Sequence, residues 1–301
     1  MPLNLNKTLV VGISSRALFD LEYENEVFEK QGLEAYRMYQ IQHENEVLKP
    51  GAGFAVVKAL LNLNTPRERR TEVIIMSRNT ADTSLRIFNS IDYYGLDISR
   101  AALAGGTSLA PYLPAFNTDL FLSADGADVQ AAINANVAAG TIITNHSYHD
   151  PEADIKQLRI AFDGDAVLFS DESERIYKSE GMEAFLEHEK GNAKQPLKQG
   201  PFAKLLMTIS NIQEQYRDEE APIRTALVTA RNAPAHERVV RTLRAWGVRI
   251  DEAFFLGGVD KSEVLKAFGA HIFFDDQLLH TSPASAYVAS ATVPYRSDDR
   301  R

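Results

Sequence analysis

Short apolar runs alternate with longer, mixed stretches along the whole chain. The clearest runs are Thr8–Ile13, Val73–Met76, Leu120–Leu122, Leu158–Phe162, Thr225–Val228 and Ile272–Phe274. Each run is too short for a helix, and its apolar residues are typical of a buried strand. The stretches between the runs leave room for helices, so the spacing is that of repeated strand–helix–strand units. This pattern predicts an α/β fold with a parallel sheet and helices on both of its faces.

The second half of the chain repeats the pattern of the first half. Blocks of similar sequence occur in the same order in both halves and at nearly constant spacing. The pairs are QGLEAY (31–36) with EGMEAF (180–185), VIIMSRN (73–79) with ALVTARN (226–232), YYGLDI (93–98) with AWGVRI (245–250), Gly105-Gly106 with Gly257-Gly258, and TDLFLSAD (118–125) with AHIFFDDQ (270–277). So many matches in order indicate an internal duplication rather than chance similarity.

The duplication predicts two tandem Rossmann-like domains, each built on a parallel sheet. The connection between the halves, Thr144–Asp154, is polar and contains a proline, so we place the boundary there. Residues 1–150 would then form the first domain and residues 151–301 the second, which is the usual size of a domain. In the second half, a helical insert over residues 170–215 lies between the first two strands. We expect it to form a cap over the end of the sheet.

The composition is that of an ordinary globular protein, with 45% hydrophobic and 24% charged residues. A net charge of −9 argues against a nucleic-acid polymer as the main partner, because binding to its backbone requires a clustered basic face. The absence of cysteine excludes disulfides, thiolate catalysis and cysteine-bound zinc. There is no apolar run of about 18 residues that could span a membrane, and no signal peptide is recognisable. We therefore expect a cytoplasmic protein with no membrane partner.

Two aspartates, Asp163 and Asp165, follow the apolar run Leu158–Phe162 and are separated by one glycine. Side chains two residues apart on an extended chain point the same way, so both carboxylates can converge on one substrate if the extended geometry continues. One carboxylate could attack phosphorus while the other transfers a proton to the leaving oxygen. By itself, an Asp-Gly-Asp sequence is more often a solvated turn. The prediction of a phosphoryl-accepting site therefore depends on further groups.

Further polar residues follow the other strands of the second half. Thr229 and the pair Asp275 and Asp276 come directly after apolar runs, and Lys261 follows a Gly-Gly loop. In a doubly wound sheet, ligands bind at the carboxyl ends of the strands. A cluster of acids requires a counter-ion, and Mg²⁺ binds carboxylate, water and phosphate oxygens. The sequence thus predicts a magnesium site and a substrate that carries phosphate.

The first half lacks these ionisable groups. The internal alignment places Ser14 and Arg16 opposite Asp163 and Asp165, Met76 opposite Thr229, Leu109 opposite Lys261, and Ser123 and Ala124 opposite Asp275 and Asp276. We therefore expect the first half to have the same sheet topology but to bind no catalytic metal. Its crevice is interpreted either as a packing surface or as a regulatory nucleotide site that uses Arg16.

The motifs of the second half resemble those of the haloacid-dehalogenase-like superfamily of phosphohydrolases. The matching segments, in order, are DGDAV, VTA, DKSEV and FFDDQ. More closely, SSRALFDLE, FDGDAVLFSDESER, EHEK, LVTAR and HIFFDDQ resemble the type I cytosolic 5′-nucleotidases over nearly the whole chain. This resemblance implies two domains of that superfamily's fold, the first without catalytic acids. It also implies Mg²⁺-dependent removal of the 5′-phosphate from nucleoside monophosphates such as AMP and deoxynucleotides.

The resemblance also implies roles for individual residues. Asp163 would be the nucleophile that forms an aspartyl-phosphate, and Asp165 the general acid and then the general base. Thr229 and Lys261 would hold the phosphate. Ala230 and Arg231, which follow Thr229 toward a helix N-terminus, are further candidates for substrate contact. For Arg231 a structural role is the alternative, because Arg78 is found at the matching position of the first half. Asp276, with Asp275 beside it, would bind Mg²⁺ together with Asp163 and the backbone carbonyl of Asp165. Many members of the superfamily have a further acid four residues beyond the metal-binding one, and here that position is His280, which leaves open whether Asp275 or Asp276 binds the metal directly.

Two other functions fit the same motifs. One is a phosphatase of another small phosphomonoester, because the motifs define phosphoryl transfer but not the leaving group. The other is a nucleotide-sensing binding protein, against which the intact set of catalytic residues argues. The preferred base and sugar, any effector and the oligomeric state stay open, and a homo-oligomer is compatible with the sequence.

Overall fold

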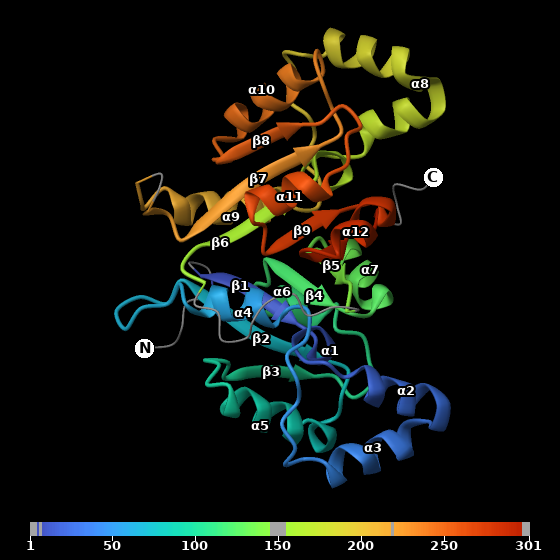
Figure 1. The fold of residues 1–301 in the computed structure, drawn as a ribbon, viewed down its shortest axis with the longest axis vertical. Helices are drawn as coiled ribbons and strands as arrows, with labels where there is room; N and C mark the ends of the chain where they lie inside the picture. Colours follow the sequence, from blue (N-terminus) through green and yellow to red (C-terminus); the bar gives the residue numbers. More distant parts are fainter. Residues whose placement is uncertain (1–4, 6–7, 145–154, 218–219, 297–301) are drawn as a thin grey trace.

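The computed structural model describes residues 5, 8–144, 155–217 and 220–296. In these residues, ten strands form one sheet in the order β3-β2-β1-β4-β5-β10-β9-β6-β7-β8. The strands of the first half are β1 (Leu9–Ile13), β2 (Thr71–Ser77), β3 (Arg100–Leu103), β4 (Leu120–Ser123) and β5 (Ala138–Ile142). Those of the second half are β6 (Leu158–Phe162), β7 (Ile223–Thr229), β8 (Glu252–Phe255), β9 (Ile272–Asp275) and β10 (Ala289–Thr292). Figure 1 shows the two halves one above the other along the long axis of the molecule.

The sheet is parallel within each half, and its one antiparallel pair in the described residues joins β5 to β10. Small residues line this junction. A Cβ atom at Gly140 would lie 2.8 Å from the Ala291 side chain and 3.3 Å from the Phe274 ring. Glycine therefore allows the two half-sheets to meet closely. The predicted mixed α/β fold and all six predicted strands are confirmed, but the two parallel sheets merge into one sheet instead of remaining separate.

The connecting helices follow the strands as expected for an α/β protein. In the first half they are α1 (Ser15–Leu18), α2 (Glu22–Gln31), α3 (Leu33–Gln42), α4 (Phe54–Leu61), the 3₁₀ helix Ala81–Thr83, α5 (Leu85–Tyr93), α6 (Tyr112–Ala115) and α7 (Gly126–Asn134). In the second half they are the π-helical turn Gly164–Leu168, α8 (Glu172–Gly191), α9 (Ala203–Gln213), α10 (His236–Trp246), α11 (Ser262–Phe268) and α12 (Leu278–Ala284). Strands β1, β2, β4 and β9 are buried along their whole length, as expected for parallel strands that are covered on both faces.

Local sequence signals explain where several helices begin and end. The Asp125 carboxylate accepts hydrogen bonds from the amides of Ala127 and Asp128 and so caps the N-terminus of α7. Helices α10 and α11 end at Gly247 and Gly269, whose φ angles are +64° and +69°. Glycine adopts this left-handed conformation without the steric cost that other residues pay.

The hydrophobic core extends across both halves. One cluster of buried side chains contains residues from Leu9 in β1 to Val293 after β10. Helix α9, which lies within the predicted cap segment, packs into this core through Leu206 and Ile209. Helix α8 lies at the periphery (Figure 1). The segment 170–215 is therefore divided between one core helix and one peripheral helix.

The halves also share their unusual backbone geometry. Gly32, between α2 and α3, has a φ of +85°, and Gly181, which interrupts α8, has a φ of +87°. Hydrogen bonds that close equivalent loops join the Ala104 amide to the Ser77 carbonyl and the Leu256 amide to the Thr229 carbonyl. These hydrogen bonds place Ser77 of the first half opposite Thr229, whereas the alignment of the two half-sequences predicted Met76 at this position. The predicted domain boundary, residues 144–154, falls almost entirely outside the described residues.

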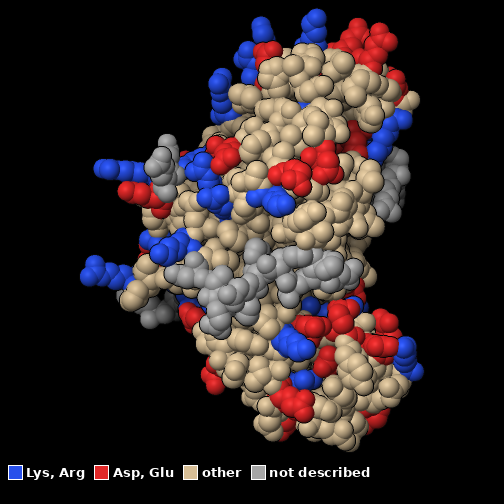
Figure 2. Space-filling view, viewed as in Figure 1, with Lys and Arg blue, Asp and Glu red and all other residues tan. Residues whose placement is uncertain are grey.

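Two surface features bear on the predicted partners. Within the described residues, no helix combines the length and the apolar character that a membrane span requires. On the face shown in Figure 2, acidic and basic side chains are interspersed among uncharged ones, with no continuous basic area.

Candidate active site

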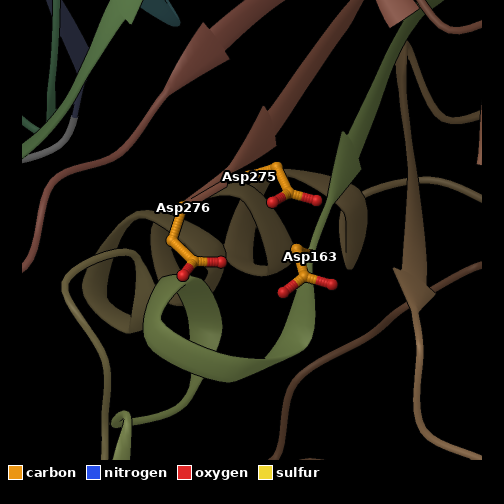
Figure 3. A group of neighbouring side chains, drawn as sticks. All are labelled: Asp163, Asp275 and Asp276. Atoms are coloured by element: carbon orange, nitrogen blue, oxygen red, sulfur yellow. The ribbon is translucent and has the colours of Figure 1, made fainter. Parts of the chain in front are cut away.

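Asp163 and Asp275 lie side by side because the strands that precede them are hydrogen-bonded neighbours. Phe162 of β6 pairs with Phe274 of β9, and the Asp163 amide donates a hydrogen bond of 2.8 Å to the Phe274 carbonyl. The next residue on each chain is therefore an aspartate at the same edge of the sheet. Figure 3 shows these two carboxyl groups and that of Asp276 gathered where the two strands end. The side chains of Asp163 and Asp275 are buried.

Lys261 bridges these two carboxylates. Its Nζ lies 2.5 Å from Asp163 Oδ1 and 2.6 Å from Asp275 Oδ2. Burial would lower the pKa of Lys261, but the two carboxylates outweigh burial and raise this pKa above its ordinary value, so the amine is an ammonium group. Burial also raises the pKa of Asp163 to about 7; Lys261 opposes this shift, and Asp275 and Asp165 add to it. The lysine thus partly neutralises a buried acidic cluster.

Asp276 is the third acid of the cluster and belongs to a network with Tyr295 and Glu174. The Tyr295 hydroxyl lies within hydrogen-bond distance of Asp276 Oδ2, and 2.8 Å from Glu174 Oε2. Burial raises the pKa of Asp276 to about 8; the carboxylates of Asp163 and Glu174 add to the shift, and the tyrosine hydroxyl opposes it. A phenol has one proton to donate, so two charged carboxylates cannot both accept it. The network therefore suits a site at which an additional proton or a bound cation offsets the charge of the second carboxylate.

The cluster has the composition of a site for a hard divalent cation. One carboxylate oxygen from each of Asp163, Asp275 and Asp276 lies within 4.8 Å of the others. Among the described residues, Asp276 Oδ1 is buried without a hydrogen-bond partner, which is unfavourable unless another ligand contacts it. Oxygen donors alone favour Mg²⁺-like ions over zinc. His280, four residues beyond Asp276, does not belong to this group. Its pKa is lowered, mainly by burial and also by the positive charge of Lys261.

Asp165 has a different environment from the one that its spacing suggested. Its carboxylate forms a bidentate ion pair with Arg231, with 2.7 Å between Asp165 Oδ2 and Arg231 Nε and 2.7 Å between Asp165 Oδ1 and Arg231 Nη2. The chain after Asp163 enters a tight turn in which Ala166 has a φ of +62°. As a result, the Asp165 carboxylate is not part of the three-acid group.

Arg231 is one of three charged residues that connect the site to α8. Its Nη1 contacts Glu189 Oε2 at 2.5 Å, and Arg238 Nη1 lies 2.9 Å from Glu189 Oε1. All three side chains are at most 5% exposed. Burial would raise the pKa of Glu189, but Arg231, the Ser173 hydroxyl and Arg238 together lower it below the ordinary value. Arg231 therefore forms ion pairs with two carboxylates, those of Asp165 and Glu189.

Thr229 and the glycine between the two aspartates are close neighbours. A Cβ atom on Gly164 would lie 3.2 Å from Thr229 Oγ1, so glycine keeps the loop near this hydroxyl. Thr229 is buried at the end of β7, and its Oγ1 accepts a hydrogen bond of 3.2 Å from the Arg231 amide. Ala230 is exposed between them. The site residues predicted from the sequence thus occupy one edge of the sheet, where Asp163, Lys261, Asp275 and Asp276 form its buried centre.

A cavity of 590 Å³ adjoins this edge. Its lining includes Ala166, from the turn after Asp165, and Tyr295, which contacts Asp276. Sequence reasoning missed Tyr295, Glu174 and Glu189. Glu174 and Glu189 had a signal, since they lie within the segments FDGDAVLFSDESER and EHEK that resemble the nucleotidases, whereas nothing near Tyr295 in the sequence indicates its contact with Asp276.

The fold and the site define an α/β protein with a buried acidic cluster of the kind that binds a divalent cation. A family model described as 5′-nucleotidase matches residues 1–300, and the chain belongs to this family. It is 40% identical over 291 residues to human cytosolic 5′-nucleotidase 1B, an alignment that covers 92% of this chain and 47% of the human protein. The chain therefore spans about half the length of that curated relative. No solved structure matches the chain significantly.

Proposed function

We propose that this chain is a Mg²⁺-dependent 5′-nucleotidase that hydrolyses nucleoside 5′-monophosphates, such as AMP and deoxynucleotides, in the cytoplasm. One observation carries the proposal: the buried ammonium of Lys261 contacts both Asp163 and Asp275 at the strand ends of a chain that belongs to the 5′-nucleotidase family. The name of the human relative is consistent with this substrate class and with this location.

In the proposed reaction, Asp163 attacks phosphorus and forms an aspartyl-phosphate while the bond from phosphorus to the 5′-oxygen breaks. Asp165 donates a proton to that oxygen, and the nucleoside leaves. Asp165 then takes a proton from a water molecule, which attacks phosphorus, breaks the acyl-phosphate bond and releases phosphate. Thr229 and Lys261 hold the phosphoryl oxygens, and Lys261 also offsets the negative charge that develops there.

Mg²⁺ would be held by Asp163, Asp276 and the backbone carbonyl of Asp165, with Asp275 beside it, and would neutralise phosphate charge when bound. Arg231 keeps the Asp165 carboxylate at the rim of the cluster, so in this proposal its role is positioning. The nucleoside part of the substrate would extend toward the 590 Å³ cavity beside Tyr295.

We further propose that the two halves arose by duplication, with residues 1–150 as a domain of the same superfamily fold that has lost its catalytic acids, and residues 151–301 as the catalytic domain. The matching loop hydrogen bonds and glycine conformations support this history. Within the insert 170–215, α8 is the part that would act as a cap, because Glu174 and Glu189 on this helix reach the site.

A phosphate-release assay tests the function. The purified chain is given AMP, deoxynucleoside monophosphates and sugar phosphates, each with Mg²⁺ and with a chelator. We expect release from nucleoside monophosphates only in the presence of Mg²⁺. Faster release from sugar phosphates would identify a different phosphatase, and nucleotide binding without any release would identify a sensor.

A further inference from the structure

The first half contains a cavity of 320 Å³ at the carboxyl ends of its strands. Its lining includes Ser14, which follows β1, Ser77 and Asn79 at the end of β2 and beyond it, and Phe28 and Tyr36 from α2 and α3. A volume of this size is at the lower end of the range of small-molecule sites, about 300–1,000 Å³. The cavity occupies the place in the first half that corresponds to the catalytic edge of the second half.

An aromatic pair lies over this cavity and has a counterpart in the second half. The rings of Phe28 and Tyr36 meet edge to face, with centroids 6.0 Å apart and an interplanar angle of 81°. Tyr177 and Phe185 on α8 make the same contact, at 6.3 Å and 78°. Phe28 is 46% exposed, so part of its ring is free to pack against a planar ligand.

Asn79, one of the residues that line the cavity, carries an unused hydrogen-bond donor. Asn79 Oδ1 accepts a hydrogen bond of 3.3 Å from the Tyr36 hydroxyl, which in turn accepts one of 3.0 Å from Gln40 Nε2. This network fixes the orientation of the Asn79 amide. Among the described residues, the Asn79 Nδ2 group is buried without a partner, an unfavourable arrangement that a ligand carbonyl or ring nitrogen would relieve.

The charges around the cavity argue against an anionic ligand. Arg16 is held by both oxygens of Glu22, each at 2.8 Å, and Arg78 Nε lies 2.7 Å from Asp128. Asp125 adds a negative charge to the lining, and its Oδ1 accepts hydrogen bonds from the first amides of α7. The position that corresponds to Lys261 is the buried Leu109. The described lining therefore offers a phosphate no unpaired cation, which argues against the alternative of a regulatory nucleotide site that uses Arg16.

We propose that this cavity binds an uncharged nucleoside, with the base against Phe28 and a base acceptor on Asn79 Nδ2. The choice of a nucleoside rests on the proposed function, because the cavity keeps the aromatic pair of the catalytic half but lacks its phosphate-binding lysine. The ligand is then the substrate without its phosphate, which is the product of the proposed reaction.

Isothermal titration of the full chain with adenosine tests the proposal. Phe28→Ala should weaken adenosine binding about tenfold or more, since stacking of a base on an aromatic ring is worth roughly a factor of ten. Asn79→Asp, which keeps the acceptor for Tyr36 and removes the Nδ2 donor, should also weaken it. The matched control is Tyr112→Ala, which removes an equally exposed aromatic side chain of the first half that does not line this cavity and should leave this binding unchanged.

Three results would overturn the proposal: no adenosine binding to the wild-type chain, wild-type affinity in Phe28→Ala and Asn79→Asp, or an equal loss of binding in Tyr112→Ala. AMP hydrolysis is measured on the same preparations. Hydrolysis without adenosine binding in the first half rejects only the nucleoside site, whereas adenosine binding without hydrolysis rejects only the proposed function.

Discussion

Arg231 and Asp165 form a bidentate ion pair in which two nitrogens of the guanidinium each lie 2.7 Å from a different carboxylate oxygen. This contact orients the second aspartate of the Asp-Gly-Asp sequence, because a planar guanidinium allows only one alignment of the two groups. It also connects the loop after β6 to Glu189 on α8. The position of the proposed acid–base residue thus depends on residues far from it in the sequence.

Arg231→Lys should lower kcat for AMP by about tenfold to a hundredfold, because lysine keeps the charge but cannot hold Asp165 by two parallel hydrogen bonds. Steady-state phosphate release measures the change. The control is Arg224→Lys at the other end of β7, which alters a partly exposed pair with Glu252 and should leave kcat unchanged. Equal effects of the two substitutions would contradict the positioning role.

Asp163→Asn should reduce turnover by roughly 10⁴-fold or more, because an amide cannot attack phosphorus. The fold should persist. Burial raises the pKa of Asp163 to about 7, so the folded protein favours the protonated, neutral carboxyl group. The contribution of this group to folding stability is therefore fully present below its ordinary pKa and is lost as the pH rises through 7 and the group ionises. At pH 8 the neutral amide should therefore leave the unfolding temperature unchanged or raise it. A well-folded variant with near wild-type activity would exclude Asp163 as the nucleophile.

Beryllium fluoride with Mg²⁺ should raise the unfolding temperature by about 5 °C near saturation, because it mimics the aspartyl-phosphate and binds only the folded site. Differential scanning fluorimetry measures the shift. Omitting Mg²⁺, or replacing Asp163 by Asn, should abolish it. A shift that persists without Mg²⁺ would argue against a metal in the site.

Gly164→Ala should impair activity more than stability, because the new methyl group would lie 3.2 Å from Thr229 Oγ1 and must displace this hydroxyl. We expect a several-fold rise in KM for AMP, with a loss of about 1 kcal/mol in the free energy of unfolding. Gly191→Ala is the matched control, since a Cβ there has no neighbour within 4 Å. An unchanged KM in Gly164→Ala would remove Thr229 from the phosphate site.

Glu189→Gln should destabilise the protein by about 3 kcal/mol at pH 7, because it leaves two buried arginines without a shared carboxylate. The folded-state pKa of Glu189 lies below its ordinary value of 4.5. Its contribution is therefore present above pH 4.5 and is lost as the pH falls through the folded-state pKa. Urea unfolding should show the difference between the variant and wild type shrinking below pH 4.5. Glu237→Gln, which breaks an exposed pair with Arg241, should have little effect at either pH.

Much of the architecture follows from short-range patterns in the sequence. The strands Leu158–Phe162 and Ile272–Phe274 could be predicted because they are short and mostly apolar, and Asp163, Asp275 and Asp276 could be placed at strand ends because they directly follow them. The internal repeat also allowed a comparison of equivalent positions without any structure. Strands β5 and β10 were harder to predict, since the alanine, glycine and serine that make up most of them give a weak strand signal.

By itself, the sequence determined the α/β class, the order of most strands along the chain and the set of acidic residues at one edge, because these depend on neighbours along the chain. Only the tertiary structure decided how distant residues meet. Lys261 contacts Asp163 across 98 positions, and Tyr295 reaches Asp276 from the irregular segment that follows β10. The antiparallel junction at Gly140 likewise turns two half-sheets into one. Such contacts depend on packing over the whole fold, which no local pattern encodes.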